Sequence, residues 1–461
     1  MKRRTDHYAS YKDPSAKVFF CEDEPDALFR ELSPSYLPHY QYFKSSGLSD
    51  ELVSKSWLLP FQEIQDNIAG TTILKTRKIP FVSYPYEWTF QQWQDAALLS
   101  LKIHYQALKF GMILKDATPF NIVFDGAKPV FVDTSSFEIF KQGQPWQAYR
   151  QFSENFHMPL LIVKYFGSIG NEIYINNPNG IPLYKGLALL PAGARLNFNT
   201  LFYLTLPDKI RRRIKDPAKP MKESTGRFSN KRSLQFADQL FHTIRKIKPL
   251  KKRTPWNSYY DANTTHPAYL QEKEQVVKEW LSSHANKTLI DFGCNTGHFS
   301  ILLASSFNTV IAFDADLESV NELYTACHQK KISNVFPFYA DLVNPSPATG
   351  FNNRERPALL QRLKADTGLA LALLHHLVFT YNVQFGMIAE LFAATCDELV
   401  IEFVPKEDKK VQLLLFTKKD IFDWYTFENF IAAFEKKFTI KNTNRFANNR
   451  ILVHFTTAKH E

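Results

Sequence analysis

Residues Leu289–Gly297 read LIDFGCNTG, and this stretch decides the fold of the last two-fifths of the chain. An apolar run leads into Asp291, two glycines bracket residues 294–296, and an apolar helical pattern begins at His298. The pattern predicts a buried strand, a tight turn and the start of a helix. Glycine is needed where the backbone has a positive φ or where a ligand comes close. The first N–H groups of a helix can bind a carboxylate or a phosphate.

The alternation of strands and helices continues from this stretch to the end of the chain. A second apolar run, Thr309–Phe313, ends in Asp314, and an acidic residue at that place can accept both ribose hydroxyls of a nucleoside. The strands that we predict are 288–292, 309–313, 335–339, 369–374, 398–403, 438–442 and 451–456. The first five are nearly continuous apolar runs, as in parallel strands covered on both faces. The fold class is therefore α/β, with a doubly wound, Rossmann-like sheet of seven strands that ends in an antiparallel hairpin.

Acidic residues and glycines gather at the ends of the predicted strands, where such sheets bind their ligands. Asp291 and Gly293 follow the first strand, Asp314 the second and Asp341 the third. Together these residues resemble the cofactor site of the class I S-adenosylmethionine-dependent methyltransferases. The resemblance implies that the chain binds S-adenosyl-L-methionine through Asp291, Gly293, Asn295, Gly297, Asp314, Asp341 and Leu342. Asn295 stands where that family usually has a glycine, which makes the loop stiffer.

A dinucleotide is the competing ligand for a turn of this kind. Its fingerprint is G-x-G-x-x-G, whereas this chain has D-x-G-x-x-x-G from Asp291 to Gly297. The terminal hairpin also favours the methyltransferase topology. In that topology Asp291 lies near the ammonium group of the cofactor, Asp314 near its ribose and Asp341 near the exocyclic amine of its adenine.

Two adjacent histidines, His375 and His376, follow the fourth predicted strand. A histidine at that place can act as general base toward a hydroxyl acceptor, and we predict His375 ahead of His376 for this role. The alternative is a structural pair, in which one ring packs in the core and the other caps a helix. No metal site is predicted in this domain.

The first half of the chain contains a second motif, LKDATPFNIVFDGAKPVFVDTSSF at residues 114–137. The Asp125-Gly126 pair predicts a hairpin turn between two short strands. Asp116, Asn121 and Asp133 then converge at one end of that hairpin. Phosphoryl transfer uses such a set, with one carboxylate near the acceptor hydroxyl and Asn and Asp oxygens as ligands for Mg²⁺.

This motif resembles the catalytic loop of the protein-kinase-like fold, whose α+β architecture we expect for residues 1–205. The resemblance implies that Asp116 is the base and that Asn121 and Asp133 hold Mg²⁺ and, through it, ATP. The chain departs from that family because Leu114 replaces the usual His, and neither a glycine-rich loop nor a strand lysine is apparent; Glu24–Leu32, for example, has the pattern of a short helix. Three interpretations stay open: an active kinase, a kinase-like fold kept for binding or architecture, and a hairpin that mimics the motif.

Motif order along most of the chain is similar to one bacterial subgroup, the nodulation-protein NoeA-like methyltransferases. The domains that we predict are a kinase-like domain (1–205), a basic connector (206–255) and a methyltransferase domain (256–461). The implied function is methyl transfer to an oxygen of a small or carbohydrate-derived acceptor. The alternatives are a bifunctional kinase–methyltransferase that modifies a glycan, and a non-catalytic cofactor-binding scaffold for an anionic partner.

The net charge of +10 is concentrated between the two domains. Residues 208–253 contain 16 Lys and Arg against 4 Asp and Glu, a balance of +12. Such a segment is either a solvated linker or a platform for an anionic partner. Nucleic acid is not expected, because the pattern of aromatic residues typical of a single-strand channel is missing.

Composition indicates a cytoplasmic protein with packed cores. Of its 461 residues, 44% are hydrophobic, enough for two or three domains. The four cysteines show no CxxC spacing, which fits a reducing compartment better than a zinc site or a disulfide framework. The basic N-terminus is not followed by the apolar region of a signal peptide, and no apolar run is long enough to predict a membrane span.

Overall fold

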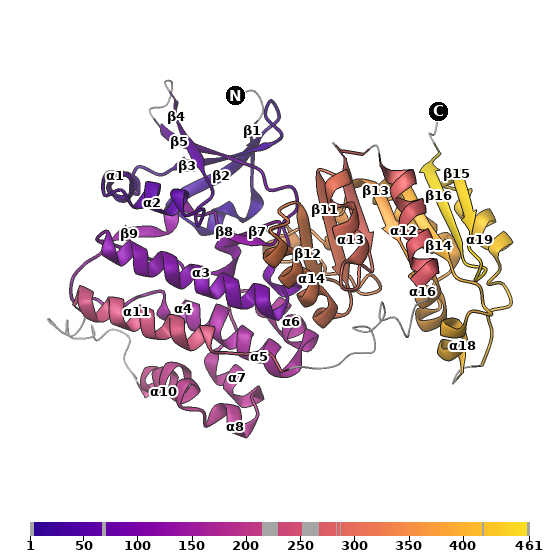
Figure 1. Cartoon of the computed structure of the whole chain (residues 1–461). Coiled ribbons are helices and arrows are strands. Elements are labelled where there is room, and N and C mark those ends of the chain that lie inside the picture. The colour runs from indigo at the N-terminus through magenta and orange to yellow at the C-terminus, as the bar shows by residue number, and fades with distance from the viewer. Residues whose placement is uncertain are drawn as a thin grey trace. The chain divides into compact units, whose positions relative to one another are not determined.

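The computed structural model describes residues 4–66, 71–213, 229–250, 267–282, 284–285, 287–416 and 419–458. The chain forms two compact units (Figure 1). The first contains residues 1–251 and 349–356, and the second contains residues 252–348 and 357–461. Of the predicted connector, residues 206–213 and 229–250 are described and belong to the first unit, whereas 214–228 and 251–255 lie outside the described residues.

The first unit begins with an antiparallel sheet in the order β1-β2-β3-β5-β4. Its strands are β1 (Arg4–Asp6), β2 (Ala16–Cys21), β3 (Ala27–Leu32), β4 (Phe61–Asp66) and β5 (Thr71–Arg77). Two short strand pairs follow, β6 (Met112–Leu114) with β9 (Phe137–Ile139) and β7 (Ile122–Asp125) with β8 (Lys128–Phe131). The β7–β8 hairpin is the one that the Asp125-Gly126 pair predicted, and Gly126 has the positive φ of such a turn.

The prediction of a helix at Glu24–Leu32 was wrong, because residues 27–32 form strand β3. The spacing of their apolar residues fits the period of a helix as well as that of a strand. However, β3 pairs with β2 on one side and with β5 on the other. Phe29 packs against Phe19 of β2, with stacked rings 5.3 Å apart. Pairing with two neighbours therefore overrides the local helical pattern.

Helices make up most of the remaining first unit. They are α1 (Leu37–Ser45), α2 (Leu48–Ser54), α3 (Phe90–Lys109), α4 (Tyr149–Phe152), α5 (Met158–Phe166), α6 (Ser168–Ile175), α7 (Leu183–Leu189), α8 (Ala192–Arg195), α9 (Phe198–Thr200), α10 (Leu206–Arg213) and α11 (Asn230–Arg245). Helix α3 begins with a capping box formed by Thr89 and Gln92. Helix α11 packs beside α3 (Figure 1), and Gln94 donates to the carbonyls of Ile244 and Ile247 at its end. This part of the basic segment is thus a packed helix.

Two π-helical turns interrupt the helices of the first unit, η5 (Ser153–His157) and η6 (Leu201–Thr205). Each ends two residues before a proline, Pro159 or Pro207. Proline has no N–H to donate to the preceding turn, and its ring crowds the carbonyl four residues earlier. Widening that turn removes the crowding while the helix continues.

The second unit is a single mixed sheet in the order β12-β11-β10-β13-β14-β16-β15. The strands are β10 (Thr288–Phe292), β11 (Thr309–Asp314), β12 (Val335–Tyr339), β13 (Ala365–Ala370), β14 (Cys396–Phe403), β15 (Phe438–Arg445) and β16 (Ile451–Thr457). The first five in the chain are parallel, and β16 runs antiparallel between β14 and β15. The predicted fold class, with its terminal hairpin, is confirmed.

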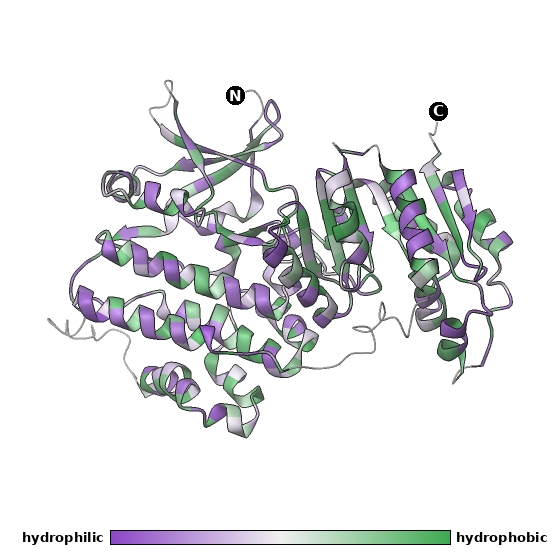
Figure 2. Cartoon of the chain, in the orientation of Figure 1, coloured by the Kyte–Doolittle hydropathy of each residue, from purple (hydrophilic) through white to green (hydrophobic). Residues whose placement is uncertain are grey.

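Helices flank this sheet, whose parallel strands are hydrophobic along most of their length (Figure 2). They are α12 (Pro267–Leu281), α13 (His298–Leu303), α14 (Leu317–Lys330), α15 (Leu359–Arg362), α16 (Leu374–Tyr381), α17 (Phe385–Ala393), α18 (Lys409–Leu415) and α19 (Phe427–Phe434). Among the residues that the structure describes, no helix has both the length and the apolar character needed to cross a bilayer.

The fourth strand lies earlier than we predicted, at residues 365–370 rather than 369–374. Asp366 and Gly368 obscured it, because neither is typical of a buried strand. Asp366 accepts a hydrogen bond from the backbone of Thr288 at 2.7 Å, and a side chain at Gly368 would lie 2.7 Å from the sulfur of Cys396. The chain then turns at Ala372, where φ is +51°, so the two histidines lie in the first turn of α16.

Candidate active site

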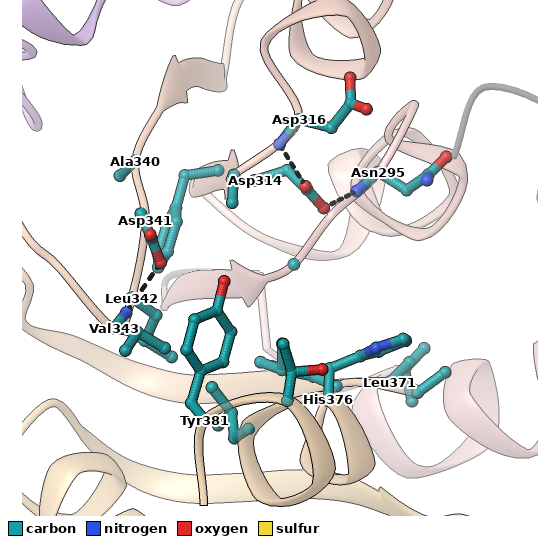
Figure 3. A pocket seen from close by; sticks show the side chains of 17 residues that line it. Asn295, Asp314, Asp316, Ala340, Asp341, Leu342, Val343, Leu371, His376 and Tyr381 are labelled. Carbon is teal, nitrogen blue, oxygen red and sulfur yellow. Dashed lines mark hydrogen bonds between the residues drawn. The ribbon is translucent and has the colours of Figure 1, made fainter. Parts of the chain in front are cut away.

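A cavity of about 350 Å³ opens at the C-terminal ends of the parallel strands in the second unit (Figure 3). Its walls come from the segments that follow β10, β11, β12 and β13 and from helix α16. The residues that line it are Gly293, Asn295, Phe313, Asp314, Ala315, Asp316, Ala340, Asp341, Leu342, Val343, Leu371, Ala372, Leu373, His376, Leu377, Thr380 and Tyr381. The structure therefore brings together six of the residues predicted for this site, namely Gly293, Asn295, Asp314, Asp341, Leu342 and His376.

The turn after β10 forms one wall of the cavity. The N–H groups of Gly293 and Cys294 both donate to the carbonyl of Phe313 at 3.0 Å, which fixes the turn against β11. Positive φ angles occur at Gly293 (+74°) and Asn295 (+52°), and asparagine tolerates this region better than most residues. Asn295 therefore replaces the glycine usual in the resembling family without breaking the turn.

Gly297 has a structural task at the start of α13 and does not line the cavity. Its φ is +79°, and a side chain there would lie 2.1 Å from Leu323. Both the backbone conformation and the close packing require glycine. Its predicted contact with the cofactor stays a prediction.

The carboxylate of Asp314 is a polar group fixed at the edge of the cavity. Its carboxylate accepts the backbone N–H groups of Asn295 and Asp316, both at 2.8 Å (Figure 3). Burial raises the pKa of Asp314 to about 6, although these backbone hydrogen bonds lower it. The carboxylate is thus held rigidly by the protein backbone at the edge of a nucleoside-sized space.

Asp341 and Tyr381 line the other end of the same cavity. Asp341 accepts the backbone N–H of Val343 at 2.9 Å, which fixes the loop after β12. Tyr381, on α16, projects toward this loop (Figure 3). Burial and, after it, the charge of Asp341 raise the pKa of its hydroxyl. We did not predict Tyr381 as a site residue, because nothing in its sequence context distinguishes it from a packing residue.

Asp291 lies behind the cavity, inside the core of the unit. Its carboxylate accepts the hydroxyl hydrogen of Ser300 on α13 at 2.6 Å. Burial raises the pKa of Asp291 to about 7; the hydroxyl of Ser300 lowers it and the charge of Asp314 raises it further. Asp291 joins β10 to α13, and its predicted interaction with an ammonium group stays a prediction.

The two histidines on α16 have different positions. His376 lines the cavity, whereas His375 is fully buried, with its ring 4.2 Å from that of His376. Neither ring nitrogen of His375 has a hydrogen-bond partner within the described part of the chain. Burial, and then the charge of Lys410, lowers the pKa of His376 to about 4. His376 is therefore a neutral imidazole at pH 7, able to accept a proton.

A buried polar cluster fixes helix α12 to strand β14 of the sheet. Lys273 of α12 donates to Glu402 of β14 at 2.8 Å, and Tyr269 and Arg450 contact the same carboxylate. Burial raises the pKa of Glu402, but the charges of Lys273 and Arg450 outweigh it and lower the pKa to about 2. Each member of the cluster has a partner, so its clearest role is to hold α12 in place.

Comparisons with known proteins place this geometry in a family. No family model matches the chain. Over 443 residues the chain is 30% identical to the nodulation protein NoeA of Rhizobium meliloti (strain 1021), an alignment that covers 94% of this chain and 92% of that protein. The chain belongs to the NoeA family.

Solved structures are similar to parts of this NoeA-family chain. The magnesium protoporphyrin IX methyltransferase ChlM of Synechocystis PCC 6803, which holds SAH in its crystal, is 17% identical with a TM-score of 0.33, and the match covers 48% of this chain and 95% of that chain. WbdD, crystallised with a kinase inhibitor, is 13% identical with a TM-score of 0.29, over 47% of each chain. At these identities the likeness concerns the fold alone. By its own strand order, the second unit has the sheet of the S-adenosylmethionine-dependent methyltransferase fold.

The first unit of this NoeA-family chain brings the predicted kinase-like residues together. Asn121 donates to Ser136 at 3.0 Å and to Asp133 at 3.4 Å. Asp116 accepts a hydrogen bond from Gln151. Burial raises the pKa of Asp116, and the charge of nearby Asp133 raises it further. The motif thus forms one polar cluster, as its spacing indicated.

Arg30, which we did not predict as a site residue, completes this cluster. Its guanidinium, on β3, forms an ion pair with Asp133 and donates to Ser135 at 2.9 Å and to the carbonyl of Val132 at 3.1 Å. The second carboxylate oxygen of Asp133 accepts the hydroxyl hydrogen of Ser136. Arg30 therefore contacts the carboxylate that the kinase-like resemblance assigns to Mg²⁺. In the described part of the chain, no group of three or more His, Cys, Asp or Glu side chains is placed to hold a metal ion.

Proposed function

We propose that the second unit transfers the methyl group of S-adenosyl-L-methionine to an oxygen of a small or carbohydrate-derived acceptor. The observation that carries this proposal is the cavity at the strand ends, with the rigidly held carboxylate of Asp314 at its edge. When bound, the cofactor supplies a methyl group already activated by its sulfonium charge. The chain then has to bind, orient and shield the reactants.

The residues present fit the cofactor. The cavity, at about 350 Å³, is in the range of small-molecule sites. Asp314 offers carboxylate oxygens to the ribose hydroxyls, and Asp341 offers one to the adenine amine. The turn at Gly293 and Asn295 leaves room for the amino-acid end of the cofactor. Each assignment places a negative or polar group where the cofactor carries hydrogen-bond donors.

His376 is the best-placed general base for the acceptor in this proposal. A hydroxyl acceptor must lose its proton as the new O–C bond forms, and a neutral imidazole at the cavity wall can take it. Its pKa, lowered to about 4 by burial, keeps His376 neutral throughout the neutral range but also makes it a weak base, so its position at the cavity wall is what supports this role. The ring of His375 packs 4.2 Å from that of His376. Leu371, Leu373 and Leu377 give the cavity an apolar lining beside it.

The first test is cofactor binding by isothermal titration calorimetry. We expect Asp314→Ala to weaken S-adenosyl-L-methionine binding at least about 100-fold, because two charge-assisted hydrogen bonds are lost. Asp366→Asn is the matched control, since Asp366 also accepts a backbone N–H but sits at the start of β13, the end of the strand away from the cavity. Unchanged affinity in Asp314→Ala would refute the ribose assignment. Circular dichroism checks that both variants fold.

The second test identifies the acceptor. The chain is incubated with methyl-labelled S-adenosyl-L-methionine and a fractionated cell extract. We expect label in a carbohydrate-containing fraction, in a bond that survives conditions that cleave methyl esters, and we expect His376→Gln to slow labelling more than His375→Gln does. Label confined to protein or to nitrogen-containing small molecules would contradict oxygen methylation of a carbohydrate-derived acceptor.

The basic segment 208–253 is a proposed platform for an anionic partner. Its charge balance of +12 supports the idea, and the described helix α11 presents part of that charge on a packed scaffold. Binding through this segment would weaken steeply as salt is added, whereas binding that ignores salt would count against it.

A further inference from the structure

An exposed apolar stripe runs along the first unit, on the helical stretch formed by α9, η6 and α10. Phe198, Phe202, Leu206 and Ile210 follow one another at intervals of four residues, and their exposed fractions are 73%, 45%, 48% and 55%. The rings of Phe198 and Phe202 stack 5.9 Å apart on the surface. Apolar residues at helical spacing normally pack against a core. Here, as far as the described residues show, these side chains face solvent.

The stripe is not simply the core side of a loosely packed helix. The same stretch buries a different face, made of Thr200, Tyr203 and Leu204. Tyr203 accepts, through its backbone carbonyl, the hydroxyl hydrogen of Tyr149 at 2.6 Å, which ties the stretch to α4. This helical stretch therefore has two apolar faces, of which one is packed.

Neighbouring helices extend the exposed face. Helices α7, α8 and α10 lie close together at one end of the first unit (Figure 1), and α7 contacts η6. Tyr184, Leu189 and Leu196 add large exposed apolar side chains. The stretch 183–213 also carries exposed cations at Lys185, Arg195, Lys209, Arg211 and Arg212, and we call the exposed apolar and cationic side chains together the apolar–basic face.

Arg212 joins the cationic to the apolar side chains of this face. The guanidinium of Arg212 lies 4.6 Å from the centre of the Tyr184 ring, and it pairs with Asp208 at 2.9 Å. Against the five cations of the face, Asp208 is the one carboxylate that the described stretch 183–213 contains. Large apolar side chains beside a surplus of Lys and Arg are typical of helices that lie in the interface of an anionic bilayer.

We propose that the apolar–basic face binds the surface of an anionic lipid membrane. The phenylalanine and leucine side chains would enter the boundary between headgroups and acyl chains, and the cations would contact lipid phosphates. A second copy of the chain is a poorer occupant, because an isologous dimer would bring the same five cations of each copy together. Lipid headgroups instead supply the opposite charge. The helices of this face would lie on the membrane rather than cross it.

The experiment is co-sedimentation of the full chain with vesicles. One set of vesicles contains phosphatidylcholine with about one third phosphatidylglycerol, and the other contains phosphatidylcholine alone. We expect binding to the anionic vesicles and at least about tenfold weaker binding to the neutral ones. The double variants Phe198→Ser/Phe202→Ser and Arg211→Gln/Arg212→Gln should each weaken binding to anionic vesicles about tenfold or more.

The matched control is Met387→Ser/Ile440→Ser, which removes two exposed apolar side chains of the second unit and should bind vesicles as the wild type does. Circular dichroism and urea denaturation check that each variant is folded. No binding to anionic vesicles would overturn the proposal, and so would equal binding by all variants. Concentration-dependent self-association that is lost in Phe198→Ser/Phe202→Ser, without vesicle binding, would assign the face to a second copy instead.

Discussion

Asp133 in the first unit and Asp314 in the second are both acidic residues at the end of a β-strand, but different groups surround their carboxylates. Asp133 receives the guanidinium of Arg30 and the hydroxyl groups of two serines. Asp314 receives two backbone N–H groups and borders a cavity of about 350 Å³. The first carboxylate has a cation of its own protein beside it, whereas the second is held by neutral dipoles next to open space.

The pKa values of the two carboxyl groups move in opposite directions. Burial raises the pKa of Asp133, but the charge of Arg30 and the serine hydrogen bonds outweigh it, so the pKa is lowered. Burial raises the pKa of Asp314 to about 6, and the backbone hydrogen bonds only reduce that rise. A carboxylate whose charge is neutralised by a cation of the same protein, as in Asp133, has a structural role. A carboxylate that accepts hydrogen bonds only from neutral dipoles, as in Asp314, is stabilised most by a ligand that carries positive charge or hydroxyl donors.

Removal of Arg30 should have the largest effect on stability. We expect Arg30→Met to lower the free energy of unfolding of the first unit by about 3 kcal/mol, because it leaves the mostly buried carboxylate of Asp133 without its cation. Urea denaturation measures this difference. The double variant Arg30→Met/Asp133→Asn should recover part of the loss, since it removes both charges.

Arg77 provides the matched control on the same sheet. It lies on β5 and pairs with Asp125, but both side chains are substantially exposed. Arg77→Met should therefore cost less than about 1 kcal/mol. Equal losses in Arg30→Met and Arg77→Met would mean that the Arg30–Asp133 pair is an ordinary surface ion pair, and the contrast with Asp314 would weaken.

The second-largest expected effect is a difference in how ligands stabilise the two units against unfolding. At a concentration of 100 times its dissociation constant, S-adenosyl-L-methionine should stabilise the second unit by about 2.7 kcal/mol. Magnesium with ATP should leave the first unit unchanged, because Arg30 already contacts the carboxylate expected to bind Mg²⁺. Differential scanning calorimetry measures both shifts.

The same measurement addresses the bifunctional alternative. A magnesium-dependent shift with ATP that disappears in Asp133→Ala would support an active kinase-like site and contradict the contrast between Asp133 and Asp314. The absence of any ATP-dependent shift would remove the bifunctional alternative.

The main features of the second unit could be predicted because parallel strands place their ends at one edge. Once the strands are known, the residues that follow them must be neighbours. That rule, together with the resemblance to the methyltransferases, pointed to Asp314, Asp341 and Gly293, and they line one cavity. The first unit offered no such rule, since its short hairpin and its sheet are joined by tertiary contacts.

Side-chain direction was the main limit within the second unit. Asp291 is only two residues from Gly293, but it lies within β10 and its side chain bonds to Ser300 of α13 in the core. Gly293 already belongs to the turn, where a φ of +74° changes the direction of the chain. The sequence does not indicate at which residue the strand gives way to the turn. On α16 the two histidines marked the cavity wall in the sequence, but Thr380 and Tyr381, further along the helix, carry no motif of their own.

Arg30 was missed for a different reason. The sequence around it suits a helix as well as a strand, and only pairing with β2 and β5 decides between them. A helix would have pointed Arg30 in an unrelated direction, so its contact with Asp133, 103 residues later in the chain, could not be inferred. Long-range pairing is the information that a local pattern lacks.

The smallest expected effect is the pH dependence of cofactor binding, which tests the carboxylate of Asp314 directly. Its pKa of about 6 means that the free protein holds a proton there below pH 6, while a cationic ligand with hydroxyl donors favours the ionised form. Affinity for S-adenosyl-L-methionine should therefore rise with pH and be about tenfold weaker at pH 5 than at pH 8. Calorimetry at pH 6, in buffers with different ionisation enthalpies, should detect proton release on binding. Asp314→Asn should remove most of that dependence. If the dependence centres near pH 7 and survives in Asp314→Asn, then Asp291, whose pKa is raised to about 7, is the group that responds to the cofactor.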